Sequence, residues 1–558
     1  MFLAFFLGML AFHGWGATVG WKNANLPGNE FRQTQTAITA YFVQRDNDFS
    51  LAYPTPVLGK PWSVPFEFPL YQWTVVGVSN VTGLDLVPAG RLVSALCFYL
   101  TLPAVWLLLR RMGLARPLRW FVLAVVVSCP LHIFYARAFL IEMMALLFGV
   151  WFLWAYVEGV ERRSKALIVL ANLMGIGAGL VKVTTFMLYL MPALGWTLWW
   201  YVRLWREHGF GHPREWGSWT LWAGLAVVLP FGATLGWLEY ADYVKSLNPV
   251  GMDLMSAKMH TYNFGTWETR TSAETWAAHW NIQVTNIAGA AVLFATLLVG
   301  LIAWGRWTRW ALAAAFFFVA VQVLFPVLYA WHEYYFVANT TLLMVAIGLV
   351  LVQLWESSTM KAGRAWAICL VVIGLQVSLY LNGLYATQVV GSAGGDTVTD
   401  TLNLVTAADD VIVVAGEDWA SMTPYYARRK AWMLRSKTER SWDQIEAAMG
   451  ELVGETVGAL LLRGDQRHNG ELVSRVSTRF GLEGTPSIRW DEVDIYLRPE
   501  RYAKAAAGIG LIRAWGASVS GSISGDEVAP DGQTFFADLP VNIREPFEVC
   551  EPRPVRFK

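Results

Sequence analysis

The sequence predicts a polytopic α-helical membrane protein with a small α/β domain at its C-terminal end. Of the 558 residues, 55% are hydrophobic and only 15% are charged, and the mean hydropathy is +0.39. A chain of this composition cannot form an ordinary soluble surface. Long apolar runs fill the first part of the chain, whereas the last part reads as short strands and amphipathic helices. We therefore expect a transmembrane domain over 1–388 and a separate domain over 389–558.

Transmembrane helices are expected wherever about 17 to 25 apolar residues run together. The first run could instead be a signal peptide, but it lacks a basic segment and a clear small-residue cleavage site, so we expect a retained span. The stretch 166–202 could form one long bent span; two are favoured, because Lys182 would otherwise lie in the middle of the bilayer. The rule gives about eleven spans, near 1–18, 89–109, 119–136, 138–157, 166–181, 183–202, 219–238, 284–304, 310–330, 334–355 and 365–385.

The basic residues of the short loops predict the orientation. They occur at 110–119, 162–165, 203–214, 306–309 and 361–364, which all fall on one side of the bundle. The positive-inside rule makes this side cytoplasmic, so we expect a multi-pass protein of the cytoplasmic (inner) membrane. The opposite, extracytoplasmic side then receives a first loop over 19–88, a second large loop over 239–283 and the C-terminal domain.

The C-terminal domain is expected to have an α/β fold. The apolar runs 409–416 and 457–463 predict buried strands, and 438–450 predicts an amphipathic helix between them. From about residue 499 the chain is rich in glycine, serine and proline, which is typical of a loop-rich tail.

Eight ionisable residues beside the apolar runs map to the extracytoplasmic side of the predicted bundle. Ionisable groups near bilayer depth are costly and tend to be kept for function, and purely structural charges would be expected on both faces. The pattern therefore indicates a site. Its members are Glu30, Arg32, Glu67, Arg137, Glu142, Lys182, His332 and Glu333.

The first loop contains a predicted helix, with the sequence NEFRQTQTAITAYF at 29–42. Glu30, Gln33 and Thr34 share one helical face and would form a polar working face. Alternatively, Glu30 only stabilises the helix start through the helix dipole. The apolar members would lie along the membrane surface; they are Phe31, Ile38 and Phe42.

A single carboxylate, Glu67, lies among aromatic and proline residues in the segment PWSVPFEFPLYQW at 61–73. Prolines stiffen the backbone, and an apolar environment raises the pKa of a carboxyl group or requires a cation partner. Such a group is a candidate metal ligand or acid/base. The alternative is an ordinary glutamate at the membrane interface.

Two segments of the first loop carry a family resemblance. They are FRQTQTA at 31–37 and EFPL at 67–70. Over about its first 390 residues the chain resembles the GT-C superfamily of membrane glycosyltransferases that use polyprenyl-phosphate sugars. It is most similar to the protein O-mannosyltransferase and aminoarabinose-transferase-like group, families 39 and 83. The resemblance implies a GT-C fold.

The resemblance also implies roles for three residues of the first loop. Family members usually have an Asp-Glu pair where this chain has Asn29-Glu30, so Glu30 is the expected base. Glu67 occupies the place of a glutamate that contributes to a metal site, with Phe68 in place of the family's lysine. A divalent metal ion is thus a possible cofactor. Arg32, within the signature, is an expected contact of the donor phosphate.

Further candidates lie at the later extracytoplasmic turns. Arg137 in YARAFLIE at 135–142 resembles the family's phosphate-binding arginine, and Glu142 is expected to hold the acceptor or the first-loop helix. An Arg137–Glu142 ion pair closing a hairpin is the alternative. Lys182, in KVTT at 182–185, would be a second phosphate contact or a snorkelling lysine.

The segment WHEYYF at 331–336 matches the family's His-x-Tyr-Tyr element. His332 and Tyr334 are therefore expected to bind the donor phosphate or a metal. An interfacial aromatic belt explains the tyrosines alone, but not His332 together with Glu333. His260, in the second large loop, is a weaker metal candidate.

The expected activity is glycosyl transfer with inversion, from a polyprenyl-phosphate sugar donor to a lipid, glycan or protein acceptor at the outer face of the membrane. Apart from membrane lipids no other partner is expected; a net charge of +1 and the lack of a Gly-rich phosphate loop give no indication of nucleic acid or nucleotide. The alternative is a transporter or flippase of lipid-linked sugars, although no inverted repeat or pair of broken helices is visible.

Overall fold

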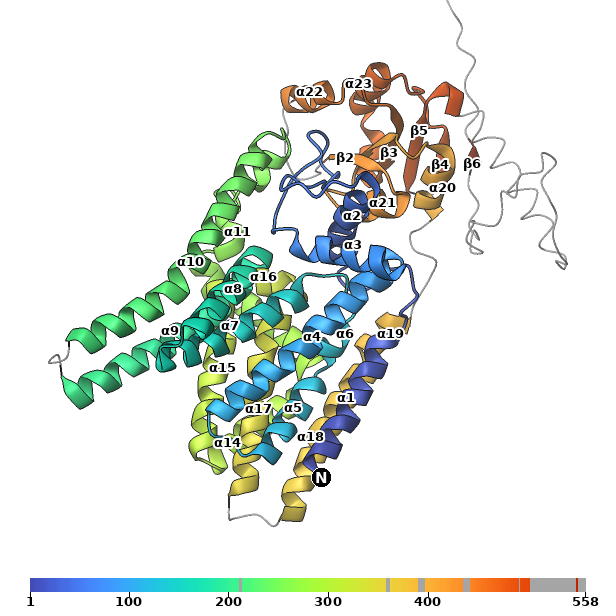
Figure 1. Ribbon diagram of the computed structural model, residues 1–558. Coiled ribbons are helices and arrows are strands. Elements are labelled where there is room, and N and C mark those ends of the chain that lie inside the picture. Colours follow the sequence, from blue (N-terminus) through green and yellow to red (C-terminus); the bar gives the residue numbers. More distant parts are fainter. Residues whose placement is uncertain are drawn as a thin grey trace, which may run out of the picture.

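A bundle of long helices carries an α/β unit at one end (Figure 1). The computed structural model describes residues 1–209, 213–357, 362–389, 397–434, 442–490, 492–501 and 548–549. The bundle consists of α1 (Phe2–Thr18), α4 (Leu86–Arg111), α5 (Arg116–Val127), α6 (Pro130–Tyr135), α7 (Glu142–Arg162), α8 (Lys165–Val181), α9 (Val183–His208), α10 (Pro213–Ser246), α14 (Ala290–Ile302), α15 (Arg306–Leu324), α16 (Pro326–Trp331), α17 (Phe336–Glu356), α18 (Ala362–Asn382) and α19 (Leu384–Val389).

Among the described residues, six helices are long and apolar enough to cross a membrane. A seventh span results if the pair Ala273–Ile287 and Ala290–Ile302, bent by 98°, counts as one. The apolar helices α1 and α8 are shorter, with 17 residues each. Each predicted run coincides with helical structure, but the predicted number of eleven spans is not confirmed.

Two of the helix breaks lie at a lysine and at a proline. The predicted break at Lys182 is confirmed, because α8 ends at Val181 and α9 begins at Val183, with Lys182 extended between them (φ −160°, ψ 100°). The run 119–136, predicted as one span, is interrupted at Ser128 and Cys129. Pro130, the first residue of α6, keeps Cys129 out of the helical region.

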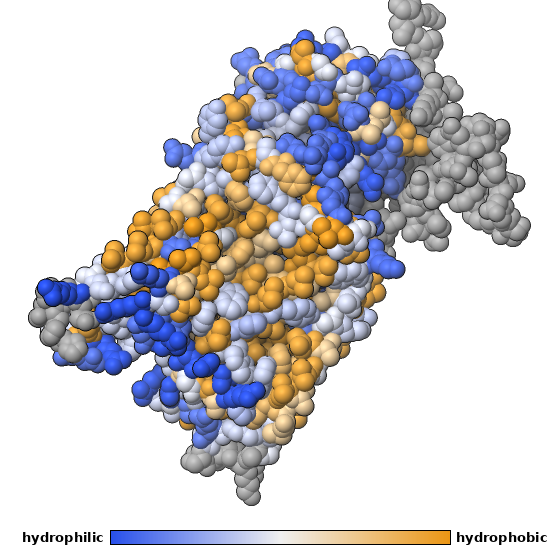
Figure 2. Space-filling view, in the orientation of Figure 1, coloured by the Kyte–Doolittle hydropathy of each residue, from blue (hydrophilic) through white to orange (hydrophobic). Residues whose placement is uncertain are grey.

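The surface of the bundle is apolar between two hydrophilic ends (Figure 2). Large hydrophobic side chains on α9, α10, α14, α15 and α18 are exposed, including Leu198, Leu229, Leu297, Phe316 and Val371. Exposed apolar area of this extent needs lipid to cover it. The protein therefore crosses a membrane several times.

The α/β unit contains a six-stranded sheet with the order β2-β1-β3-β5-β4-β6. The first three strands in this order are parallel, and the remaining pairings are antiparallel. The strands are β1 (Val411–Ala415), β2 (Lys430–Leu434), β3 (Val457–Arg463), β4 (Ile488–Trp490), β5 (Val493–Leu497) and β6 (Glu548–Val549). The helices are α20 (Thr397–Val405), α21 (Met422–Ala427), α22 (Trp442–Glu451) and α23 (Gly470–Phe480).

The two predicted strands and the helix between them are confirmed as β1, β3 and α22, although positions 438–441 of the predicted helix lie outside the described residues. The predicted loop-rich tail also lies outside them, apart from 499–501 and 548–549. The placement of this unit on the extracytoplasmic side stays a prediction.

The first loop lies between the bundle and the sheet, and it contains α2 (Glu30–Asp46) and α3 (Leu70–Thr82). Leu58 pairs antiparallel with Trp432, so the loop covers the edge of β2. Ile38 and Phe42 are fully buried in the same core as Trp432. The prediction that these two residues lie along the membrane is wrong, because the sheet offers α2 a closer apolar surface.

The second large loop folds into short helices beside the bundle. They are the 3₁₀ helix η1 (Gly251–Leu254), α11 (His260–Phe264), α12 (Trp267–Thr271), α13 (Ala273–Ile282) and the π-helix η2 (Gln283–Ile287).

Candidate active site

Two ion pairs lie at the end of the bundle that faces the α/β unit, one largely buried and one, Arg32–Glu67, with side chains that are 15% and 9% exposed. Arg32 of α2 binds Glu67, with 2.8 Å between Nη2 and Oε2, and Lys182, between α8 and α9, binds Glu142 with 2.5 Å between Nζ and Oε2. The Lys182 and Glu142 side chains are 9% and 1% exposed. Four residues from separate predicted motifs thus come together in two pairs.

The two pairs also act on one another, since the charges of Arg32 and Glu67 influence Lys182. Burial lowers the pKa of Lys182, and the Glu142 carboxylate opposes that shift. Burial also tends to lower the pKa of Arg32. The Glu67 carboxylate and the Tyr334 hydroxyl outweigh this effect, so the pKa of Arg32 is raised. The Arg32 side chain therefore stays charged, in a setting of low polarity where its interactions are strong.

Aromatic rings form one wall of this site. Nζ of Lys182 lies 3.8 Å from the ring centroid of Tyr335 and 5.1 Å from that of Tyr334. His332 stacks on Tyr334 with 5.3 Å between centroids, and its Nε2 lies 2.5 Å from the Tyr262 hydroxyl. A cation over such rings is stabilised without losing its hydrogen-bond donors.

His332 is neutral at physiological pH. Burial, together with the positive charges of Lys182 and Arg32, lowers its pKa from the ordinary 6.5 to about 4. It can therefore donate one N–H to an anion but adds no positive charge. The electrostatic attraction for a phosphate comes from Arg32 and Lys182.

Both cations keep donors free for a ligand. A guanidinium has five N–H donors and an ammonium three. Arg32 uses one for Glu67 and one for Gln35, and Lys182 uses one for Glu142. Three donors of Arg32 and two of Lys182 remain, which is enough to bind the oxygens of one phosphate group.

A second polar network surrounds Glu333, next to His332 in the chain. Asn29 and Tyr135 donate to its Oε1 over 3.1 and 2.8 Å, and Asn286 of η2 donates to Oε2. Asn29 also donates to the Tyr135 hydroxyl over 2.7 Å. A carboxylate has about four acceptor positions, so these three bonds leave one free.

The Glu30 side chain contacts a different part of the protein from the side chains of Asn29 and Arg32. Its carboxylate accepts a hydrogen bond from Tyr426 of α21, whereas Asn29 contacts Glu333 and Arg32 contacts Glu67. Residues two positions apart on a helix point to opposite sides, so Glu30 and Arg32 face different surroundings.

The remainder of the predicted polar face of α2 is structural. The Gln33 side chain donates to three backbone carbonyls, those of Leu26, Pro27 and Gly28, and accepts from the backbone N–H of Phe139. Thr34 bonds to the backbone of its own helix. These contacts fix the chain before α2 and thereby position Asn29.

Arg137 lies apart from the two ion pairs. Its Nη2 donates to the backbone carbonyl of Gly20 over 2.9 Å, and Arg91 donates to the same oxygen over 2.9 Å. Arg137 is 3% exposed, and Glu142 pairs with Lys182 instead. Arg137 therefore fixes the start of the first loop, and the alternative of an Arg137–Glu142 pair is wrong.

The metal candidates do not form a site in the described part of the chain. Both oxygens of Glu67 accept hydrogen bonds, from Arg32 and from Gln72. His260 is exposed and packs on Phe264. No group of three His, Cys, Asp or Glu residues among those described could hold a metal ion. Glu67 and His260 as arranged therefore do not fit a divalent ion.

The sequence did not single out some residues that the structure places at the site or beside it. They include Arg91, Tyr262, Asn286 and Tyr426. Arg91 and Asn286 are polar residues within or beside apolar runs. Polar residues are costly in a membrane, so their positions in the sequence do indicate a role. Tyr262 and Tyr426 come from regions far along the chain, and nothing in their local sequence predicts His332 and Glu30 as their partners.

The bundle, the α/β unit and the charged site between them define a multi-pass membrane protein with a polar site at one membrane face. No protein-family model matches the chain, and no curated protein sequence matches it. Solved structures do match. ArnT from Cupriavidus metallidurans bound to undecaprenyl phosphate gives a TM-score of 0.56 at 14% identity, over 88% of this chain and 97% of that one.

The apo structure of ArnT from the same organism gives a TM-score of 0.54 over the same shares of the two chains, again at 14% identity. At this identity the likeness establishes the fold. The protein has the fold of ArnT.

Proposed function

We propose that the protein transfers a sugar from a polyprenyl-phosphate donor to an acceptor hydroxyl at the outer face of the cytoplasmic membrane. The observation that carries the proposal is the pair of little-exposed cations, Arg32 and Lys182, which keep spare donors at the membrane face of the bundle. The shared fold supports it, since an ArnT structure with this fold is bound to undecaprenyl phosphate.

The chemistry needs no nucleotide, because the sugar is already activated by its bond to phosphate. The acceptor oxygen attacks the anomeric carbon, the bond between that carbon and the phosphate oxygen breaks, and the electron pair leaves with the lipid phosphate. Arg32 and Lys182 stabilise this leaving charge, which is the main electrostatic contribution in such a transfer. One in-line displacement inverts the anomeric centre.

Glu333 is the proposed general base for the acceptor hydroxyl. It belongs to the network that includes Asn29, and three donors hold its carboxylate with one acceptor position free. A positioned carboxylate that takes a proton during attack typically contributes a factor of about 10²–10⁴. Asn29 cannot accept a proton, so in this arrangement it orients Glu333.

The sequence-based prediction gives the same role to Glu30. One Glu30 oxygen accepts from Tyr426, and the other keeps no hydrogen bond among the described residues. The two assignments differ in their expected kinetics. If Glu333 is the base, Glu333→Gln lowers kcat by about 10²–10⁴ and Glu30→Gln has a small effect; if Glu30 is the base, the order is reversed.

The test is transfer from a panel of radiolabelled polyprenyl-phosphate sugars by membranes that contain the wild-type chain or a variant. The variants are Arg32→Gln, Lys182→Met, Glu333→Gln and Glu30→Gln, at matched expression. Glu274→Gln, an exposed residue of the second loop, is the control. We expect transfer by the wild type and the control, and its loss in Arg32→Gln and Lys182→Met.

Consumption of no donor by the wild type would overturn the proposal. If labelled lipid-linked sugar then crosses the bilayer of vesicles only when the protein is present, the protein is a flippase instead.

A further inference from the structure

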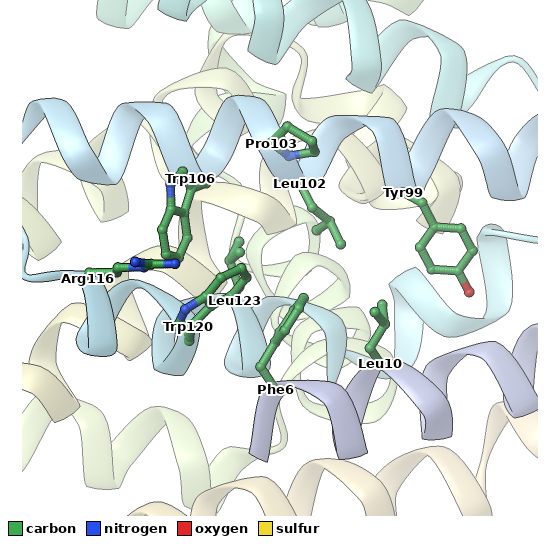
Figure 3. Close-up of a pocket in the computed structure, with 9 residues that line it drawn as sticks. All are labelled: Phe6, Leu10, Tyr99, Leu102, Pro103, Trp106, Arg116, Trp120 and Leu123. Carbon is green, nitrogen blue, oxygen red and sulfur yellow. The ribbon is translucent and has the colours of Figure 1, made fainter. Parts of the chain in front are cut away.

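An apolar groove opens on the bundle far from the candidate active site, at the end opposite the α/β unit. It has a volume of about 660 Å³ and lies between α1, α4 and α5 (Figure 3). Its walls are Phe6 and Leu10 of α1, Tyr99, Leu102, Pro103 and Trp106 of α4, and Arg116, Trp120 and Leu123 of α5. Nearly all of this lining is apolar, so the groove suits a hydrocarbon chain.

Aromatic rings are concentrated at one end of the groove. Trp106 and Trp120 lie 4.1 Å apart between centroids, and Phe6 lies 5.1 Å from Trp120. Figure 3 shows Arg116 at this same end, beside Trp106, whereas Leu10 and Tyr99 lie at the other end. Tryptophan is enriched at the level of lipid head groups, so this end is the one where a head group would lie.

Three arginines gather at the aromatic end, and no described carboxylate pairs with them. The positive charges of Arg110 and Arg116 both act on Arg119, whose guanidinium lies 4.3 Å from the Trp106 ring centroid. In the described part of the chain none of the three forms an ion pair, whereas the neighbouring Arg111 contacts Glu158 and Glu161. The buried Nε of Arg119 also has no hydrogen-bond acceptor.

We propose that this groove is a binding site for one anionic phospholipid, with an acyl chain along the groove and the head-group phosphate on Arg110, Arg116 and Arg119. Arg110 and Arg116 are exposed at the predicted membrane surface. Three like charges near one another attract an anion, and a phosphate between them reduces their mutual repulsion. Basic pockets between helices at the membrane surface bind anionic head groups in this way. The bound lipid would fill the groove between α4 and the packed helices α1 and α5.

The site is distinct from the proposed donor site in place and in chemistry. The donor site uses two cations that are each held by a carboxylate, next to the α/β unit. The groove uses unpaired arginines at the opposite end of the bundle, at the predicted cytoplasmic leaflet. Loss of one site is therefore expected to leave the other intact.

The test is native mass spectrometry of the intact protein released from nanodiscs of phosphatidylcholine, with or without phosphatidylglycerol. We expect one phosphatidylglycerol to stay bound to the wild type. The double variant Arg116→Gln with Arg119→Gln should bind phosphatidylglycerol about thirtyfold more weakly. Each basic side chain near an anionic lipid contributes about 1 kcal/mol, and the variant lacks two of them. Arg206→Gln with Arg309→Gln, two exposed arginines at the same end, is the matched control.

A second variant tests the groove without removing any charge, so that loss of lipid can be distinguished from misfolding of the arginine variants. Leu10→Trp fills the apolar end of the groove without touching the arginines, and it should also release the lipid. Equal retention of phosphatidylglycerol by all variants would overturn the proposal. So would equal retention of phosphatidylcholine by the wild type, or occupation of the groove by a polyprenyl phosphate in membranes that contain both lipids.

Discussion

Removing Lys182 is the most informative perturbation of the ion pairs. The substitution Lys182→Met leaves the Glu142 carboxylate without its cation, at 1% exposure. Breaking one member of a buried pair costs about 3–5 kcal/mol, because the remaining charge is neither hydrated nor paired. We expect a marked fall in the unfolding temperature, measured by tryptophan fluorescence of the purified protein in detergent.

The double variant Lys182→Met with Glu142→Gln should recover most of that stability, since replacing both partners by neutral groups of similar size is often close to neutral. It should not recover transfer. The phosphate would still lack one of its two cations, and loss of such a donor typically lowers kcat by about 10²–10³.

Transfer at the wild-type rate by the double variant would refute the role of Lys182 in binding phosphate. An unchanged unfolding temperature in Lys182→Met would show that the Glu142 carboxylate does not need its cation to stay buried. The control Lys258→Met removes an exposed ion pair with Asp253, and it should change the free energy of unfolding by at most about 1 kcal/mol.

Three further predictions concern residues around the site. Tyr262→Phe removes the hydroxyl that contacts His332. In the same transfer assay it should lower kcat/KM by a factor of about ten or less, which is the usual contribution of one hydrogen bond. Arg137→Met removes the bond to the Gly20 carbonyl; it should lower the free energy of unfolding by about 1.5–3 kcal/mol but leave the KM for the donor unchanged, whereas a raised KM would support the phosphate contact predicted from the sequence. Because the pKa of His332 falls from 6.5 to about 4, the unfolded chain binds more protons than the folded one between these values, so the stability of the wild type should rise with pH through this window and level off above it. A thermal unfolding series from pH 4.5 to 7 should show a shallower rise for His332→Gln, and identical slopes would count against a neutral, buried His332.

The sequence predicted the helical runs, β1 and β3 because each depends on local periodicity. It also predicted the break at Lys182, since a lysine in the middle of a bilayer is costly. The number of spans was harder to predict, because α1 and α8 are short and the α13–α14 pair is sharply bent.

The sequence places four charged residues of the candidate site on one membrane face, but it does not predict how they pair. Arg32, Glu67, Glu142 and Lys182 were all expected on one membrane face. That Arg32 binds Glu67 and that Glu142 binds Lys182 depends on how α2, α7 and the α8–α9 junction pack together, which no local pattern encodes. For the same reason the sequence could not place Ile38 against the sheet, since its hydrophobicity suits a membrane surface and a protein core equally.

The most direct test of the central claim is equilibrium binding of radiolabelled undecaprenyl phosphate to the purified protein in phosphatidylcholine nanodiscs. We expect saturable binding to the wild type and to Glu333→Gln, because a base for the acceptor is not needed to hold the lipid phosphate. Binding to Arg32→Gln and to Lys182→Met should be at least tenfold weaker, since each loses a charge-assisted contact. Equal binding by all four proteins would contradict the assignment of Arg32 and Lys182 as the phosphate site.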